Sequence, residues 1–217
     1  MTTAPTDPRR DRRVRRPRSD GERSRAAILH EAARLATVEG IAGLSISRLA
    51  QAVGMSKSGL IAHFGSKQEL QLATIETARA IFAEEVVEPA LAGRTGLERL
   101  QALAERFLAH VEARVFPGGC FFASLAAEMD THPGPVRDRA VELAEEWARQ
   151  LETAVRDAQD EGAIDAAEDP RELAFELDAY LLLANAQFVV SQEPTPIRHA
   201  RRALQRRLAA AAPARTS

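Results

Sequence analysis

The residues best suited to chemistry lie in a short polar stretch around Lys57, Ser58 and His63. An ammonium group and small hydroxyls donate hydrogen bonds to phosphates and to the acceptor edges of bases in a major groove. Lys57 and Lys67 are the only lysines in the sequence, and both lie in or beside this stretch. The pattern favours recognition of a nucleic acid over the making or breaking of bonds.

Other reactive residue types are present, but they are not grouped for catalysis or metal binding. The five histidines include no pair at the spacing of zinc ligands on a helix. Asp130 and His132 could approach a metal, although a polar surface loop explains them more simply. Cys120 precedes two phenylalanines, which favours a buried small side chain over a nucleophile. The sequence therefore predicts no cofactor, no metal site and no enzymatic activity.

A helix-turn-helix pattern over residues 45–64 would carry the polar stretch. Apolar residues recur at i, i+3, i+4 and i+7 from Ile46 to Val53, which is one face of a helix. Gly54 suits the positive φ of a helix end, and Ser56 can cap a second helix almost at once. Two short helices joined so tightly must cross steeply. An ordinary helical hairpin shows the same features, so the rest of the chain has to decide.

Charge is divided unevenly along the 217-residue chain, whose net charge is −2. Residues 1–67 hold 13 Lys and Arg against 6 Asp and Glu, and the remainder holds 16 against 25. A basic head on an acidic body is typical of a protein with one DNA-binding end. Residues 1–20 contain seven arginines and few apolar residues, which predicts a disordered arm. Such an arm either solubilises the chain, or follows the phosphates or enters the minor groove of DNA.

Composition predicts an all-α fold, because the chain is rich in helix-forming residues and only 5% aromatic. We expect a three-helix DNA-binding domain over residues 21–67, whose first helix spans about 22–38, and a helical body over residues 68–210. The body helices are expected at about 66–89, 97–115, 120–129, 135–161, 169–191 and 196–209.

Nothing in the sequence predicts a membrane segment. The most apolar window, residues 180–190, contains Asn185 and Gln187 and is too short to span a bilayer. The basic N-terminus is not followed by an apolar run, so it does not resemble a signal peptide. A single cysteine fits a reducing compartment, and we expect a cytoplasmic protein.

Residues 23–70 resemble the DNA-binding domain of the TetR (tetracycline-repressor) family. The matching words run AAILHEAARLATVEGIAGLSISRLAQAVGMSKSGLIAHFGSKQEL, and G-I-x-G-L-S followed by L-x-x-H-F-x-S-K is a specific combination. Ile61 departs from the family, which usually has an aromatic residue there, so a tyrosine contact to phosphate is not expected. The resemblance implies that seven positions meet DNA: Ser45, Ser47, Lys57, Ser58, Gly59, His63 and Lys67.

The resemblance also implies a homodimeric repressor that a small molecule releases from a palindromic operator. The last two helices, at about 169–191 and 196–209, would pair across the twofold axis. Double-stranded operator DNA, an unknown small-molecule effector and a second copy of the chain are the implied partners, with no membrane. Two rival functions are a ligand-independent architectural or division-linked DNA-binding protein and a helical enzyme with an appended DNA-binding head.

A ligand cavity in the helical body is likewise implied by the resemblance. Aromatic side chains with a few polar tips usually line such a cavity, although ordinary core packing is the better explanation for any single one of them. The candidate lining residues are Phe107, His110, Phe121, Phe122, Met129, Trp147, Tyr180 and Asn185.

Overall fold

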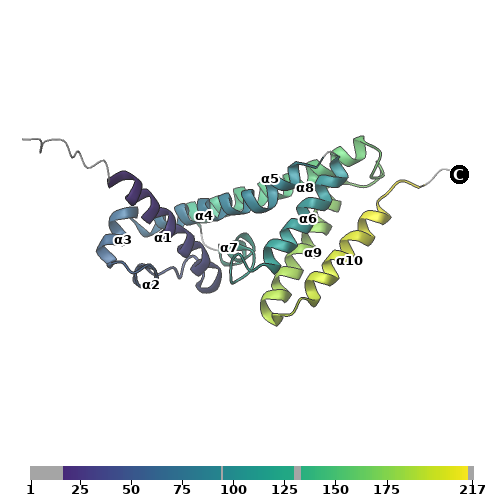
Figure 1. Cartoon of the computed structure of the whole chain (residues 1–217). Coiled ribbons are helices and arrows are strands. Elements are labelled where there is room, and N and C mark those ends of the chain that lie inside the picture. The colour runs from purple at the N-terminus through teal and green to yellow at the C-terminus, as the bar shows by residue number, and fades with distance from the viewer. Residues whose placement is uncertain (1–16, 94, 130–132, 215–217) are drawn as a thin grey trace, which may run out of the picture.

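The structure, a computed structural model, describes residues 17–93, 95–129 and 133–214 of the chain. Within these ranges the chain forms helices joined by turns and loops, without a strand, which confirms the all-α prediction. Figure 1 shows α1–α3 at one end, α4 leading into the body, and α9 and α10 side by side at the other end. The elements are α1 (Pro17–Glu39), α2 (Ile46–Ala52), α3 (Lys57–Phe64), α4 (Lys67–Phe82), the π-helix η1 (Ala83–Val87), α5 (Glu88–Leu91), α6 (Gly96–Glu112), α7 (Phe121–Met129), α8 (Pro135–Asp160), α9 (Pro170–Ser191) and α10 (Thr195–Ala210).

Helix α1 begins at Pro17, five residues before the expected start of the first helix. A proline suits the first turn of a helix, because its fixed φ is helical and the missing N–H would have no partner there. The structure thus places residues 17–20, which were expected to belong to a disordered arm, at the start of α1. The rest of that arm, with six of its seven arginines, lies outside the described residues.

The head is built as the local signals predict. The hydroxyls of Ser45 and Ser56 cap α2 and α3, and the Ser56 oxygen accepts a hydrogen bond from the Gly59 N–H at 3.1 Å. Gly54 has φ +67° in the turn between them. A compact core joins α1, α2, α3 and α4; its buried members include Ile28, Leu44, Leu49, Leu60, Phe64 and Leu70.

The connection from head to body is one long helical path, α4–η1–α5, with a π turn in the middle. The π turn ends two residues before Pro89, which has no N–H to offer the carbonyl of Glu85. Arg106 Nη1 lies 3.5 Å from that carbonyl oxygen. A second core cluster packs this path against α1, α7 and α8, so the head–body junction is filled; it includes Ala36, Ile41, Ile75, Phe116, Leu125 and Leu143.

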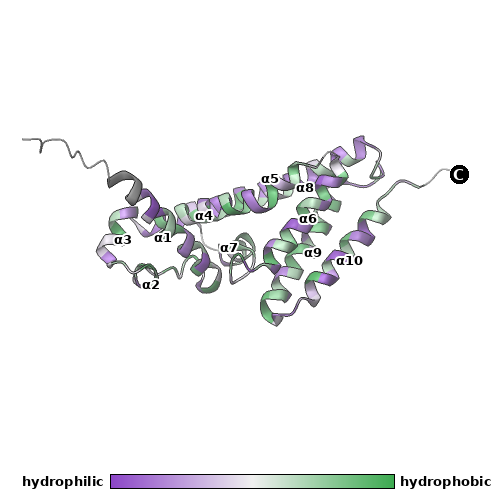
Figure 2. Ribbon diagram, in the orientation of Figure 1, coloured by the Kyte–Doolittle hydropathy of each residue, from purple (hydrophilic) through white to green (hydrophobic). Residues whose placement is uncertain are grey.

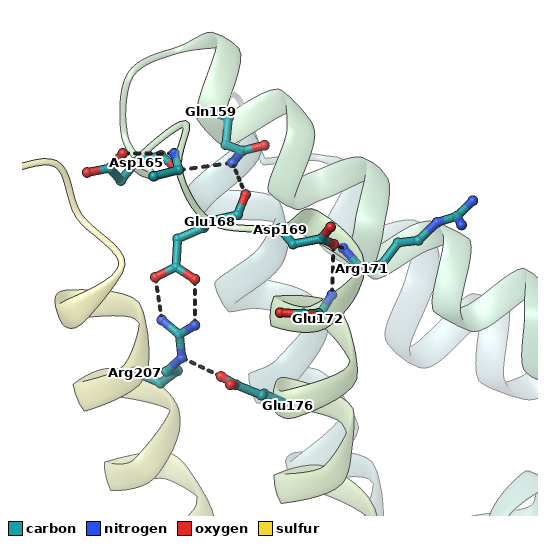
Figure 3. Close-up of polar contacts among 9 residues, drawn as sticks. Gln159, Asp165, Glu168, Asp169, Arg171, Glu172, Glu176 and Arg207 are labelled. Carbon is teal, nitrogen blue, oxygen red and sulfur yellow. Dashed lines mark hydrogen bonds and ion pairs between the residues drawn. The ribbon is translucent and has the colours of Figure 1, made fainter.

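Helices α8, α9 and α10 complete the body, and hydrophilic and hydrophobic residues alternate along α8 and α10 (Figure 2). Asp169 caps α9, accepting hydrogen bonds from the backbone N–H groups of Arg171 and Glu172 at 2.8 and 3.1 Å. Arg207 of α10 donates two hydrogen bonds to Glu168, at 2.9 and 2.6 Å, and one to Glu176 of α9 (Figure 3). These contacts hold α10 against the start of α9.

Candidate DNA interface and interhelical cavity

The seven predicted DNA contacts lie at the starts of three helices, apart from His63 in the last turn of α3. Ser45 and Ser47 are exposed at the start of α2, and Lys57 and Ser58 are exposed in the first turn of α3, next to half-buried Gly59. Helix starts present unpaired backbone N–H groups, which favour phosphate binding. The arrangement is compatible with a duplex, and the contacts themselves stay a prediction.

Lys67 at the start of α4 has a partner within the protein. Its Nζ donates a hydrogen bond to the carbonyl oxygen of Ala42 at 2.5 Å. An ammonium has three donors, so a phosphate contact can coexist with this bond. Lys67 therefore also stabilises the loop between α1 and α2.

Arg25 of α1 positions the recognition helix α3, a role that the sequence reasoning missed. Its Nη1 donates to the carbonyl oxygen of His63 at 2.7 Å, and its guanidinium lies 4.4 Å from the centre of the Phe64 ring. The two residues are 38 positions apart in the sequence, so a local sequence pattern does not predict the contact.

A cavity of about 740 Å³ lies among the helices of the body, and we call it the interhelical cavity. Four of the eight predicted residues line it: Phe107, Phe122, Trp147 and Asn185. Phe82 of α4, which was not predicted, also lines it, with its ring centre 5.5 Å from that of Phe122 and 5.4 Å from that of Trp147. A volume of this size suits a small organic molecule.

The other four predicted lining residues are not among those that border this cavity. Phe121 and Met129 point into the core cluster at the head–body junction, and Tyr180 packs against the main body core. His110 is buried between the rings of Phe82 and Phe116, and its Nδ1 lies 2.7 Å from Glu85 Oε2. For these four, core packing is the observed role.

Helix α7 connects the interhelical cavity with the head. At its start, Asn185 Oδ1 of α9 accepts a hydrogen bond from the Cys120 N–H at 2.7 Å. Near its end, the Glu128 carboxylate accepts hydrogen bonds from the Ile41 and Ala42 N–H groups at 2.6 and 2.7 Å. One face of α7 lines the cavity through Phe122 and its neighbours. A displacement of α7 would therefore reach the loop that leads into α2.

A second contact joins the start of α7 to α1. The Gly118 N–H donates to Thr37 Oγ1 at 3.1 Å, and a Cβ added at Gly118 would lie 1.8 Å from the Thr37 carbonyl oxygen. Only glycine permits so close an approach of the two backbones.

Two family models match the chain. The model "Bacterial regulatory proteins, tetR family" matches residues 28–74, and the model "Tetracyclin repressor-like, C-terminal domain" matches residues 96–204. The chain belongs to the TetR family. Its members are transcriptional regulators, so this TetR-family protein is a DNA-binding regulator of transcription, and regulators of the family are generally not enzymes. The resemblance seen in residues 23–70 is confirmed.

Solved structures of TetR-family proteins share the fold. A regulator from Chloroflexus aurantiacus is 28% identical, with a TM-score of 0.81 over 88% of this chain and 96% of that one. A regulator from Cytophaga hutchinsonii is 19% identical, with a TM-score of 0.76 over 90% and 98%. AibR, solved with isovaleryl coenzyme A and operator DNA, is 24% identical, with a TM-score of 0.67 over 84% and 97%. No curated protein sequence matches the chain.

Two further features of this TetR-family protein concern metals and membranes. Within the described ranges, no group of three or more His, Cys, Asp and Glu side chains could hold a metal ion. Asp130 and His132, which could approach a metal on sequence grounds, lie outside the described residues. Helix α9 is long and apolar enough to cross a membrane by length and composition alone, but it packs against α6, α8 and α10, as core helices do.

Proposed function

We propose that the protein is a homodimeric repressor that binds a palindromic operator and releases it when a small molecule fills the interhelical cavity. Residues 21–67 form its DNA-binding domain and residues 68–210 its ligand-binding and dimerisation domain, acting in the cytoplasm. The observation that carries the proposal is α7, which lines the cavity and holds the α1–α2 loop through Glu128. A ligand that favours one position of α7 would shift the population of DNA-binding heads.

The exposed face of α9 supports the homodimer. Apolar residues recur there at helical spacing and remain uncovered within the described chain, with Phe175 75%, Leu183 58% and Val190 86% exposed. Large exposed apolar patches mark interfaces, and a helix that is apolar all round is normally buried on all sides. A second copy of the same face, packed with α10 into a four-helix bundle, would bury it.

Sedimentation velocity tests the dimer. Phe175→Glu places a charge in the proposed interface and should shift the protein from dimer to monomer. Val141→Glu is the matched control, because Val141 is also an exposed apolar residue, 41% accessible, but lies on α8. A dimer that persists in Phe175→Glu, or is lost equally in the control, would place the interface elsewhere.

Operator binding tests the DNA interface. The operator is first selected from random duplexes, and affinities are then measured over a salt series. Lys57→Ala should weaken binding by about 1–3 kcal/mol with relaxed sequence preference if Lys57 contacts a base. Lys67→Ala should weaken all sequences alike and reduce the salt slope by about one contact. Unchanged affinity in both variants would remove α3 and the start of α4 from the interface.

A further inference from the structure

We infer that the interhelical cavity binds a hydrophobic organic cation. The inference rests on the proposed function and adds the chemical class of the effector. It follows from the charges, the unpaired acceptors and the aromatic rings that border the cavity.

The cavity border is acidic. Three carboxylates line it, Glu88, Glu146 and Asp178, against one guanidinium, that of Arg79. Arg79 is already paired, because its Nε lies 2.9 Å from Glu76 Oε2. None of the three carboxylates forms an ion pair within the described part of the chain. An anionic ligand would therefore meet uncompensated negative charge, and a cation would neutralise it.

Asp178 is the carboxylate most sensitive to a counter-charge. It is half-buried, and its Oδ1 accepts a hydrogen bond from Trp147 Nε1 at 2.8 Å. Burial raises the pKa of the Asp178 carboxyl, and the Trp147 hydrogen bond opposes the shift. A positive charge beside a desolvated carboxylate is attracted more strongly than one at the open surface.

An unsatisfied acceptor lies at the same border. Gln150 Oε1 is buried and has no hydrogen-bond partner among the described residues, and Gln150 lines the cavity one helical turn after Trp147. A buried acceptor without a donor destabilises the structure that contains it. A rotation of the Gln150 side chain would turn this oxygen toward the cavity, where an ammonium N–H would satisfy it and a carboxylate ligand would bring only further acceptors.

Four aromatic rings also line the cavity, those of Phe82, Phe107, Phe122 and Trp147. The rings of Phe82 and Trp147 meet edge to face at 5.4 Å, and those of Phe107 and Trp147 stack at 5.9 Å. Such faces attract cations and bury apolar surface. The wall and the acidic border together match a ligand with a lipophilic body and a positive charge.

Two pairs of probes matched in shape and opposite in charge test the inference: tetraphenylphosphonium with tetraphenylborate, and dodecylammonium with dodecanoate below its micelle concentration. Trp147 is the only tryptophan in the chain and lines the cavity, so its fluorescence reports occupancy directly. We expect at least one cation to give a saturable change and to bind about tenfold or more tighter than its anion. Equal or tighter binding of the anions, or no saturable change with either cation, overturns the inference.

Charge-removing variants locate the effect. Asp178→Asn keeps an acceptor for Trp147 Nε1, and Glu146→Gln keeps the shape of its side chain; each should weaken the cation about tenfold and leave the anion unchanged or tighter. Glu145→Gln is the control, because Glu145 is exposed, pairs with Arg149 at 3.3 Å and does not line the cavity. Equal losses of cation affinity in all three variants overturn the assignment of the cation site to the interhelical cavity.

Operator release, measured with the same probes, separates this inference from the proposed function. A cation that binds in the Asp178-dependent way but leaves the operator bound supports the ligand class and counts against ligand-controlled release. An anion that binds the cavity and releases the operator supports release and overturns the ligand class.

Discussion

Replacing Glu128 with alanine removes both acceptors that hold the α1–α2 loop to α7. The carboxylate accepts from Ile41 N–H in a partly buried contact at 2.6 Å and from Ala42 N–H in an exposed contact at 2.7 Å. A hydrogen bond to a charged group contributes about 1.5–3 kcal/mol, and water can replace the exposed one at little cost. We therefore expect the loop to lose about 2 kcal/mol of local stability, which is about 30-fold in its opening equilibrium.

Hydrogen–deuterium exchange of the Ile41 and Ala42 amides, read by NMR, measures this opening directly. Protection of both amides should fall about 30-fold in Glu128→Ala and by an intermediate amount in Glu128→Gln, which keeps one acceptor oxygen. Glu39→Ala is the control, because Glu39 pairs with Arg48 at 2.6 Å on the surface of the head and does not join head to body. That variant should change protection by no more than about threefold.

Unchanged protection of the two amides in a folded Glu128→Ala protein would refute the reasoning. A large loss of amide protection with unchanged ligand-induced operator release would show that Glu128 stabilises the loop but does not couple ligand binding to the head. We expect instead that this variant needs more ligand to release the operator, since the coupling between sites is a free energy that the contact contributes to.

Three further predictions concern the arm, pH and close packing. Deleting residues 1–18 should flatten the plot of log operator affinity against log salt, and an identical slope would show that the arm does not contact DNA. Burial lowers the pKa of His110 below its usual 6.5 despite Glu85, so the unfolded chain binds the extra proton and the free energy of unfolding should fall as pH drops below about 6.5. Denaturant titrations measure the free energy of unfolding at pH 5.5 and 7.5. The difference between the two values should be smaller in His110→Gln than in the unsubstituted protein, and an equal difference would exclude His110 as the cause. Gly118→Ala should cost about 1–3 kcal/mol by overpacking, whereas Gly21→Ala, with open space around it, should not destabilise the protein in the same thermal melts.

Local signals were enough to predict the head. Ser45 and Ser56 are caps, and Gly54 is a turn residue, because each acts on the backbone within a few residues of itself. Helix boundaries in the body were also predictable from capping and helix-breaking residues, such as the N-cap Asp169 before α9. The start of α1 was misjudged because charge density suggested disorder where Pro17 begins a helix.

The residues that line the cavity were predictable only in part. Hydrophobic periodicity distinguishes the inward face of a helix from its outward face, but it does not distinguish an inward side chain that packs in the core from one that lines a cavity. Phe121 and Phe122 are adjacent and equally apolar, yet the first packs in the junction core and the second lines the cavity. Phe82 was overlooked because its position depends on the packing of α4 against distant helices. The π turn at 83–87 lies close to Pro89 in the sequence, but its contact with Arg106 of α6 spans 21 residues and is not visible in a local pattern.

The hydrogen bonds at the two ends of α7 each join a side chain to main-chain N–H groups: Asn185 accepts from the Cys120 N–H, and Glu128 accepts from the N–H groups of Ile41 and Ala42. Every non-proline residue carries such an N–H, so non-proline substitutions at positions 41, 42 and 120 keep the donors of these bonds. During evolution these bonds constrain the side chains of Glu128 and Asn185 only, because the donors are main-chain N–H groups. Residue covariation in an alignment would therefore pass over these hydrogen bonds, and a search for them has to follow single conserved acceptors instead.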